Sequence, residues 1–561
     1  MARGDGREPE VVVVTGGALG IGAAIADSLA RGGAVVVVVD PGVTVDGRTT
    51  LDDTSAPSDT PVGEAGGLVR RSNASVTDGA AVERLFTGLR DEFGSLDAVV
   101  NVAGITRPSG FDSGAEDDWA AVLNVHLDGY VNVLRAALPI MAAAGRGRIL
   151  GVTSGSGWRP ANAGAYSCAK RAVAALTWQI GRVAPPGVSV NALSPIALTR
   201  MVTGAAQQAP PTAPPPAAAP TPGSSSTTGG LSLAFANMPP PEHLGPIGAF
   251  LAGEDMAWSS GAVFFSNGSE VAPIEPPRVL EAARSSDVKS LAHVIEQVVP
   301  VALATAEPAQ ATNGGSNARL PGIFDEPTDA PAVDGSGRHC AVVTDDAAWA
   351  AAVQQSLRDR GATTVSLDGA VARSFEGAAA QLAGLVADAP VDAFVLALSG
   401  GSRPLGEGWR GVVDDHVGVA DQILGDAAWI RAVADAYGAN ERPVRIATIV
   451  EAANPGGRSR AMASTQLARA AHTTTGDRID AFAVSVESSD DARRDVTSEL
   501  VAHLVCDADA AVLSGGELVV TSDWFGLRSH PHPAGSITYG GPEVPSWVEG
   551  LLRDMVTIAR I

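Results

Sequence analysis

Lysine is almost absent from this chain of 561 residues. Only Lys170 and Lys289 occur, and arginine fills nearly every other basic position. The formal net charge is −23 at pH 7. Because non-specific nucleic-acid binding depends on cations that neutralise phosphates, this balance argues against nucleic acid as a partner. It argues equally against binding to an anionic membrane surface.

Aromatic residues, cysteines and long apolar runs are also scarce. Aromatics make up 4% of the chain while hydrophobic residues make up 45%, a composition that suits a layered α/β protein of two or three domains. The three cysteines, Cys168, Cys340 and Cys506, are far apart and have no partners at metal-ligand spacing, which predicts no metal site and a reducing cytoplasm. No apolar leader precedes residue 10, and no apolar run approaches the roughly 18 residues of a membrane span.

One of the two lysines stands four residues after one of only four tyrosines, Tyr166. On a helix, residues i and i+4 share a face, so the Lys170 ammonium can lie near the Tyr166 hydroxyl. A nearby cation favours a phenolate and lowers the pKa of the phenol from its usual value of about 10. We expect this pair to exchange protons near neutral pH.

The first half of the chain begins with a βαβ pattern. Apolar strands at 11–14 and 34–39 flank a glycine-rich turn and a helix over 21–31. Further strands are predicted near 67–71, 97–101, 147–152, 188–193 and 262–266. Strands that are apolar throughout indicate a parallel sheet covered on both faces, and hence a doubly wound α/β domain over residues 9–275.

Two segments interrupt the alternation of strands and helices. Residues 205–230 are a low-complexity stretch of Pro, Ala, Ser and Thr, predicted to be a loop. Residues 276–335 are predicted to be a linker with one helix from Val279 to about Thr305.

After the linker the alternation begins again over residues 336–530. Strands are predicted at 340–344, 363–367, 391–398, 444–450, 481–486 and 517–521, which predicts a second, duplicated Rossmann-like domain. Thr344-Asp345-Asp346 stands where the first half has its glycine-rich turn, and no lysine follows Lys289. We therefore expect the second half to be catalytically silent. Residues 531–561 are predicted to be a tail with a short helix.

The glycine-rich turn of the first half lies between a strand and a helix. Glycines at 16, 20 and 22 allow a tight turn and let the backbone approach a pyrophosphate at the helix N-terminus. Asp40 ends the second strand, where a carboxylate binds ribose hydroxyls and repels a 2′-phosphate. The turn contains no Arg or Lys, so the sequence favours NAD over NADP.

These motifs resemble the short-chain dehydrogenase/reductase superfamily in order and spacing. The motifs are Thr15-Gly-x3-Gly20-x-Gly22, Asn101-Val-Ala-Gly104, Ser154 twelve positions before Tyr166, Lys170, and Asn191-Ala-Leu-Ser-Pro195. The resemblance covers about residues 9–275. Within the family, residues 122–129 and 261–268 are similar to the (3R)-hydroxyacyl-CoA dehydrogenase unit of type 2 multifunctional enzymes and to bacterial 3-oxoacyl reductases.

The resemblance implies a role for each matching residue. Tyr166 would be the general acid/base, Lys170 would bind the nicotinamide ribose and hold down the tyrosine pKa, and Ser154 would orient the substrate oxygen. The implied cofactor-binding residues are Thr15, Gly16, Gly20, Ile21, Gly22, Asp40, Ser75, Val76, Asn101, Ala103, Gly104, Tyr166, Lys170, Pro195 and Thr199.

His126 departs from the family pattern. It falls on a fourth catalytic position that is Asn in most members, so it is either part of an altered proton relay or a core histidine. Asn124 would face away from the site on a regular helix. Cys168 is interpreted as a packed helix cysteine.

The sequence therefore predicts an NAD-dependent oxidoreductase for a secondary alcohol and its ketone. The favoured substrate is a 3-hydroxyacyl thioester, which would need a local basic cluster such as Arg107, Arg159 and Arg200. A steroid, alicyclic or natural-product alcohol is the alternative substrate, and a nucleotide-binding scaffold without catalysis is the alternative of another class. The resemblance implies a homodimer, or a pseudo-dimer within one chain if the second half covers the helices that carry His126 and Tyr166.

Overall fold

Runs of valine form the two central strands of a parallel sheet. All residues of β1 (Val11–Thr15) and β2 (Val35–Val39) are buried, because helices cover both faces of this sheet. The computed structural model describes residues 9–51, 59–63, 66–158, 164–202, 238–284, 322–324, 334–370, 373–388, 390–400, 406–437, 443–488, 490 and 492–558. The low-complexity segment 205–230 lies outside these residues.

The first sheet has the strand order β19-β9-β8-β7-β6-β5-β1-β2-β4-β3, with β20 also paired to β9. The seven neighbouring strands β8, β7, β6, β5, β1, β2 and β4 are parallel. The strands β3, β9, β19 and β20 are antiparallel to their neighbours. The remaining bounds are β3 (Thr60–Val62), β4 (Gly67–Ser72), β5 (Ala98–Asn101), β6 (Gly147–Val152), β7 (Val188–Pro195), β8 (Val263–Ser266), β9 (Glu270–Glu275), β19 (His532–Pro533) and β20 (Ile537–Thr538).

Alternate valines of β1 and β2 point into two different cores. Val12 and Val36 pack with α1 (Gly20–Arg31) and α8 (Leu244–Ala252), whereas Val13 and Val37 pack with the helices on the other face. Those helices are α2 (Gly79–Phe93), α4 (Gly129–Ala144) and α5 (Gly164–Val183), and short helices occur at α3 (Glu116–Leu123), η1 (Asn124–Asp128), η2 (Gly155–Gly157), η3 (Pro241–His243) and η4 (Glu254–Met256).

The second sheet repeats the central strand order of the first, but among the described residues it ends at the counterpart of β2 and has no counterpart of β4. Its order is β11-β10-β18-β17-β16-β15-β14-β12-β13, with β13 to β17 parallel. The strands are β10 (Val279–Arg284), β11 (Gly322–Phe324), β12 (His339–Thr344), β13 (Thr363–Asp368), β14 (Ala393–Ala397), β15 (Val444–Glu451), β16 (Ile479–Val486), β17 (Glu517–Val520) and β18 (Trp524–Arg528). The helices are α11 (Ala347–Asp359), α12 (Phe375–Asp388), α13 (Gly408–Asp415), α14 (Val419–Tyr437), α15 (Pro455–Thr475), η6 (Gly476–Arg478), α16 (Ala492–Cys506) and η7 (Asp509–Leu513). The predicted fold class, two doubly wound Rossmann-like domains in tandem, is confirmed.

The two sheets exchange strands at their edges. The chain leaves β9 of the first sheet and continues into β10, which pairs with β18 of the second sheet. It then leaves β18 and continues into β19, which pairs with β9. At the crossing, the Ser529 N–H donates to the Arg278 carbonyl over 2.8 Å, and the Arg278 N–H donates to Ser529 Oγ over 3.1 Å.

This exchange corrects two expectations about the connecting segments. The helix predicted from Val279 is wrong for its first six residues, which form β10, while residues 285–305 lie outside the described part of the chain. The segment expected to be a tail contributes β19 and β20 to the first sheet before α17 (Val548–Ile558). Strand pairing with β18 therefore outweighs the local helical pattern after Val279.

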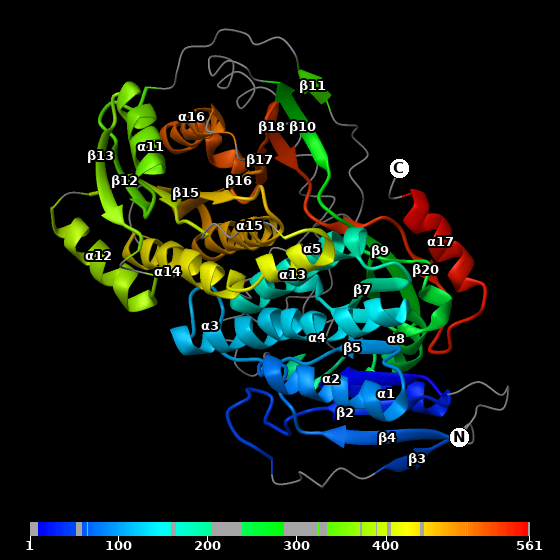
Figure 1. Ribbon diagram of the computed structural model, residues 1–561. Coiled ribbons are helices and arrows are strands. Elements are labelled where there is room, and N and C mark those ends of the chain that lie inside the picture. Colours follow the sequence, from blue (N-terminus) through cyan, green and yellow to red (C-terminus); the bar gives the residue numbers. More distant parts are fainter. Residues whose placement is uncertain are drawn as a thin grey trace, which may run out of the picture.

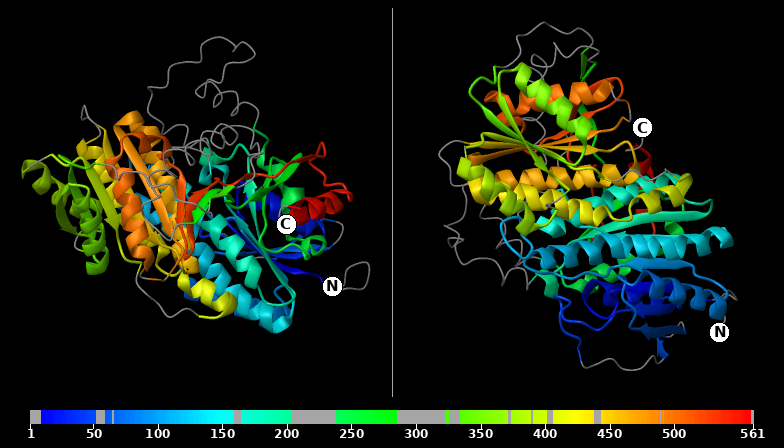
Figure 2. Two further views of the ribbon diagram at one scale, coloured as in Figure 1. Left: turned by 90° about the horizontal axis from the view of Figure 1, so that it is seen from above. Right: turned by 60° about the vertical axis from the view of Figure 1, so that its left-hand side comes forward.

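Two layers of helices lie between the sheets. Figure 1 and both views of Figure 2 show α4 and α5 of the first half facing α13, α14 and α15 of the second. One continuous hydrophobic cluster includes Leu134 of α4, Leu176 of α5, Ile430 of α14 and Leu467 of α15. The second half thus covers the helix surface that was expected to be an association surface, as the pseudo-dimer alternative requires.

A carboxylate pair at this junction gives a testable pH dependence. Burial and the nearby charge of Asp421 raise the pKa of Asp128 to about 7. An acid with a raised folded-state pKa loses stability as pH rises from its unfolded value of about 4 to its folded value. We expect Asp128→Asn to raise Tm at about pH 8 by a few degrees, and by less at about pH 5, in calorimetry at both pH values. An equal gain at both pH values would show that the Asp128 charge is not the cause.

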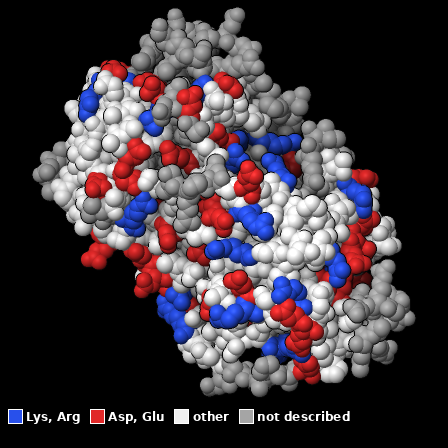
Figure 3. Space-filling view, viewed as in Figure 1, with Lys and Arg blue, Asp and Glu red and all other residues white. Residues whose placement is uncertain are grey.

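No described helix is long and apolar enough to cross a membrane. Figure 3 shows acidic and basic side chains interspersed over the face that it draws, without a continuous basic surface among the described residues on that face.

Candidate functional site

The glycine-rich turn after β1 is held against the end of β5. Thr15 Oγ1 donates to Asn101 Oδ1 over 2.7 Å and accepts from the Ala103 N–H over 3.3 Å. Gly16 has a φ of 64°, and a Cβ there would lie 2.7 Å from the Ala103 Cα. A Cβ at Gly22 would lie 2.2 Å from the Gly16 carbonyl oxygen. The turn therefore requires glycine at both positions.

The N-terminus of α1 is left without a side-chain cap. Leu19 occupies the N-cap position and makes no side-chain cap hydrogen bond, and Gly20 begins the helix with a φ of 58°. The first N–H groups of a helix attract anions when no side chain satisfies them. The residues of this turn, Gly20, Ile21 and Gly22 included, fit the pyrophosphate of a dinucleotide.

Asp40 follows β2 and lies beside the same turn. Its carboxylate accepts hydrogen bonds from the N–H groups of Ala18, over 3.3 Å, and Gly42, over 3.0 Å. These bonds fix the carboxylate at the carboxyl edge of the sheet, where a ribose would lie.

The other predicted cofactor residues lie along this edge. Val76 is buried, and its carbonyl accepts from Asn132 Nδ2, while Ser75 Oγ contacts Thr77 Oγ1 over 2.8 Å. Pro195 ends β7 beside β8. The Thr199 methyl group lies 4.0 Å from the position that a Cβ at Gly20 would take.

Ser154, Tyr166 and Lys170 meet where β6 ends and α5 begins. The Ser154 hydroxyl hydrogen-bonds the Tyr166 phenol, and Lys170 Nζ lies 5.6 Å from the centroid of the Tyr166 ring. Lys170 Nζ donates to the Val152 carbonyl over 2.7 Å, and the Lys170 carbonyl accepts from Thr153 Oγ1 over 2.6 Å. These two hydrogen bonds therefore join the end of β6 to α5 at Lys170.

Burial sets the protonation of this group. It raises the pKa of the Tyr166 phenol, and the hydrogen bond with Ser154 offsets part of the rise. Burial also lowers the pKa of Lys170 to about 7. The net direction for Tyr166 is opposite to the lowering expected from Lys170, because desolvation of the phenolate is the larger effect.

His126 packs edge-on against Tyr166, with ring centroids 5.0 Å apart. It lies in η1, a single π-helical turn, and is buried, whereas Asn124 is exposed. The His126 Nε2–H donates to the Ile105 carbonyl over 2.8 Å, and among the described residues Nδ1 has no hydrogen-bond partner. Burial and Lys170 lower the His126 pKa well below its usual value, so His126 is a neutral ring that can accept a hydrogen bond at Nδ1.

Gly104 is required by this arrangement. A Cβ at this position would lie 2.5 Å from His126 Cε1. The end of β5 and the π-helical turn therefore pack directly against each other.

Two further expectations concern side chains near the site. Arg107 Nε donates to the Asp46 carbonyl over 2.7 Å, and the guanidinium of Arg107 pairs with Asp118. Arg107 therefore binds groups of this chain instead of an anionic substrate. Arg159 lies outside the described residues. Cys168 is buried and burial raises its thiol pKa, as in a packed cysteine.

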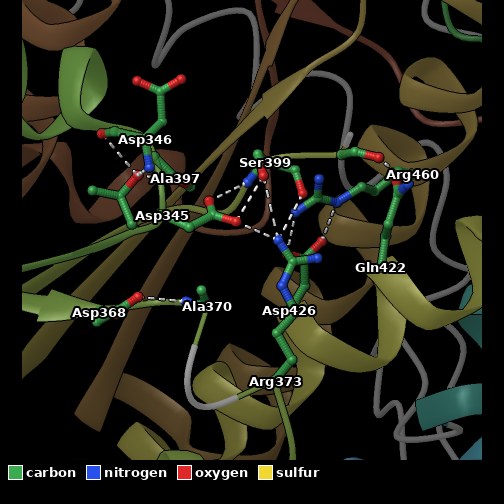
Figure 4. Close-up of polar contacts among 12 residues, drawn as sticks. Asp345, Asp346, Asp368, Ala370, Arg373, Ala397, Ser399, Gln422, Asp426 and Arg460 are labelled. Carbon is green, nitrogen blue, oxygen red and sulfur yellow. Dashed lines mark hydrogen bonds and ion pairs between the residues drawn. The ribbon is translucent and has the colours of Figure 1, made fainter. Parts of the chain in front are cut away.

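The corresponding edge of the second sheet is filled by its own side chains. Asp345, directly after β12, accepts from the N–H and Oγ of Ser399, each over 2.7 Å, and pairs with Arg373 over 2.5 Å. Behind them, Arg460 of α15 forms a buried ion pair with Asp426 of α14 (Figure 4). These charges neutralise one another within the chain.

The helix after β12 differs from α1 in its cap. Asp346 Oδ1 accepts from the N–H groups of Ala348, over 2.7 Å, and Trp349, over 3.0 Å. A carboxylate at this N-terminus satisfies the amides and repels a phosphate. In addition, α15 is the counterpart of α5, because it follows β15 as α5 follows β6. This helix contains neither tyrosine nor lysine.

Comparisons with known proteins agree with the first-half geometry. The family model described as short chain dehydrogenase matches residues 10–210. The short-chain reductase protein NovJ of Streptomyces niveus is 34% identical over 203 residues, which are 36% of this chain and 74% of that protein. The chain belongs to the short-chain dehydrogenase/reductase family.

Two other relatives in this family carry names that bear on substrate. Hydroxyacyl-CoA dehydrogenase ChsB1 of Mycobacterium tuberculosis is 31% identical over 280 residues, 48% of this chain and 81% of that protein. The 3-oxoacyl-[acyl-carrier-protein] reductase FabG of Vibrio harveyi is 35% identical over 192 residues, 34% of this chain and 73% of that protein.

A solved structure shares the fold over most of the chain. The N-domain with NADP of a bacterial malonyl-CoA reductase is 15% identical, with a TM-score of 0.59, and covers 89% of this chain and 95% of that one. Another protein of known structure therefore has the same arrangement of two sheets.

The sequence motifs of the short-chain dehydrogenase/reductase family predicted residues that the structure brings together in the first half, but they did not indicate the contacts that these residues receive from the second half. Gln466 and Arg469 of α15 donate to the backbone immediately after Ser154. Nothing in their local sequence distinguishes them from other polar helix residues. Only the packing of α15 on α5 brings them to the site.

Proposed function

We propose that this protein is an NAD-dependent oxidoreductase that interconverts a secondary alcohol and a ketone, with a 3-hydroxyacyl thioester as the substrate class. The observation that carries the proposal is the meeting of Ser154, Tyr166 and Lys170 beside an uncapped, glycine-rich helix start. The names of the relatives ChsB1 and FabG support the acyl substrate. The three cysteines are buried and free, which fits a reducing cytoplasm.

The chain's residues have distinct roles in this reaction. Tyr166, which burial keeps protonated, donates its proton to the oxygen when the ketone is reduced. When the alcohol is oxidised, the phenol must first lose this proton, and the phenolate then takes the hydroxyl proton. The Ser154 hydroxyl donates to the same oxygen and orients it. Lys170 Nζ, held by the Val152 carbonyl, lies beside the phenol, and its charged form favours the phenolate. When bound, the nicotinamide accepts or supplies the hydride at the substrate carbon.

Asp40 supports the preference for NAD. Its carboxylate is held by two backbone N–H groups at the position where a ribose would lie. It can accept hydrogen bonds from both ribose hydroxyls of NAD, and it repels the 2′-phosphate of NADP.

A substrate panel tests the reaction. We expect NADH to form with (3R)-hydroxyacyl thioesters faster than with steroid, alicyclic or other secondary alcohols, measured by NADH absorbance. Faster turnover of another class would reject the thioester assignment. A protein that binds NAD but turns over nothing, as wild type and as Tyr166→Phe, would instead be a nucleotide-binding scaffold.

The second half is proposed to bind no dinucleotide and to carry out no chemistry. Its support is the Asp345–Arg373 pair at the sheet edge and the Asp346 cap on α11. We expect one NAD per chain in isothermal titration calorimetry, lost in a Gly22→Val variant and kept in Asp346→Ala. Two sites per chain would contradict this.

A further inference from the structure

The loop after Ser154 is held from two sides. On the first-half side, a Cβ at Gly157 would lie 2.9 Å from the Arg171 N, so this loop packs directly on α5. Within the loop, the Ser156 N–H donates to Ser154 Oγ over 3.3 Å. The conformation of Ser156 therefore bears directly on the orientation of the Ser154 hydroxyl.

The second half holds the same loop by its carbonyls. Gln466 Nε2 donates to the Ser156 carbonyl over 3.1 Å, and Arg469 Nη1 donates to the Trp158 carbonyl over 2.7 Å. Both side chains extend from α15 and are buried. These bonds join residues more than 300 positions apart in sequence.

Gln466 also reaches the helix that carries Tyr166 and Lys170. Its Oε1 accepts from Arg171 Nη1 over 3.1 Å, and Arg171 Nη2 donates to Glu517 Oε2 over 2.6 Å. Arg171 is fully buried and directly follows Lys170. One glutamine of the second half thus contacts both elements that meet at the proposed site.

We propose that Gln466 and Arg469 are positioning residues, which fix the backbone of residues 156–158 and so orient the Ser154 hydroxyl toward Tyr166. The proposal rests on the proposed function, because it assigns these residues to the same reaction. Under this proposal the second half, which is proposed to carry out no chemistry of its own, positions a side chain of the reaction in addition to stabilising the fold. Without these donors, two carbonyls at a buried junction lose partners, and the loop relaxes to recover them.

Gln179 provides a matched comparison at the same junction. It extends from α5, and its Nε2 donates to the Pro455 carbonyl and to Ser459 Oγ of the second half, each over 3.1 Å. It therefore makes the same kind of contact between the halves as Gln466, but away from the Ser154 loop. A purely structural role would give the two glutamines the same effect.

The test compares Gln466→Met, Arg469→Met, Arg469→Lys and Gln179→Met in the full chain. We expect kcat to fall about 10-fold in the first two variants, with KM for NAD within about twofold of wild type, because the loss lies in the orientation of Ser154. Arg469→Lys keeps a donor for the Trp158 carbonyl and should recover much of the loss. Gln179→Met should lower Tm comparably and leave kcat unchanged.

Titration of the Tyr166 phenol by its ultraviolet absorbance, with Tyr166→Phe as the blank, supplies a readout that needs no substrate. Loss of the Ser154 hydrogen bond should raise the Tyr166 pKa in Gln466→Met and Arg469→Met but not in Gln179→Met. Unchanged titration and kcat in both variants would overturn the inference. If wild type turned over no substrate, the proposed function would fail, and this titration would still decide the positioning role.

Discussion

Tyr166→Phe is expected to lower kcat by about a thousand-fold while leaving the Kd for NAD within about twofold. The substitution removes the hydroxyl that exchanges the proton and keeps the ring that packs against His126 at 5.0 Å. Water must then replace Tyr166 in the proton transfer, which slows the chemical step and leaves NAD binding unchanged. Stopped-flow NADH formation and calorimetric NAD binding measure the two quantities separately.

Tyr130→Phe is the matched control for this prediction. Tyr130 is another buried tyrosine of the first half, and its hydroxyl contacts Thr177 Oγ1 over 3.3 Å instead of Ser154. It should cost stability and leave kcat unchanged. A Tyr166→Phe enzyme within about tenfold of wild type would show that another group manages the proton.

Asp40→Ala is expected to change the ratio of kcat/KM for NAD to that for NADP by about 100-fold in favour of NADP. The substitution removes an acceptor for the ribose hydroxyls and a negative charge that would face a 2′-phosphate. Two unit charges about 4 Å apart near a protein surface interact by about 4 kcal/mol, which is ample for this change. Steady-state kinetics with both cofactors measure it.

Asp27→Ala controls for the loss of one negative charge. Asp27 lies on α1, the helix whose start forms the proposed dinucleotide site, but its exposed carboxylate pairs with Arg31 near the other end of this helix. This variant should leave the cofactor ratio unchanged. If Asp40→Ala also left the ratio unchanged while remaining folded, Asp40 would not be the residue that selects the cofactor.

Most of the parallel strands could be predicted from sequence because they are buried on both faces, although β4 and β13 are partly exposed. Continuous apolar runs such as Val35–Val39 are stable in a layered α/β fold where helices cover both faces of the sheet. The segment after Val279 could not be predicted in this way. Its local pattern suits a helix, and the pairing of β10 with β18, a strand some 240 residues away, determines its structure.

The arrangement of the candidate site was partly predictable. Short motifs with fixed spacing predicted that Ser154, Tyr166 and Lys170 lie together, because one strand end and one helix supply all three. The direction of the Tyr166 pKa was not predictable, since it depends on how deeply the phenol is buried. Gln466 and Arg469 were not predictable either, because their role depends on how the two halves pack.

The most direct test of the central claim is isotope transfer. A (3R)-hydroxyacyl thioester carrying deuterium at C3 is incubated with wild-type protein and NAD, and the reduced cofactor is examined by mass spectrometry. We predict that deuterium appears on the nicotinamide ring with wild type, and about a thousand-fold more slowly with Tyr166→Phe. NAD bound to the protein with no deuterium transferred from this or any other alcohol would contradict the assignment of hydride-transfer chemistry to the first half.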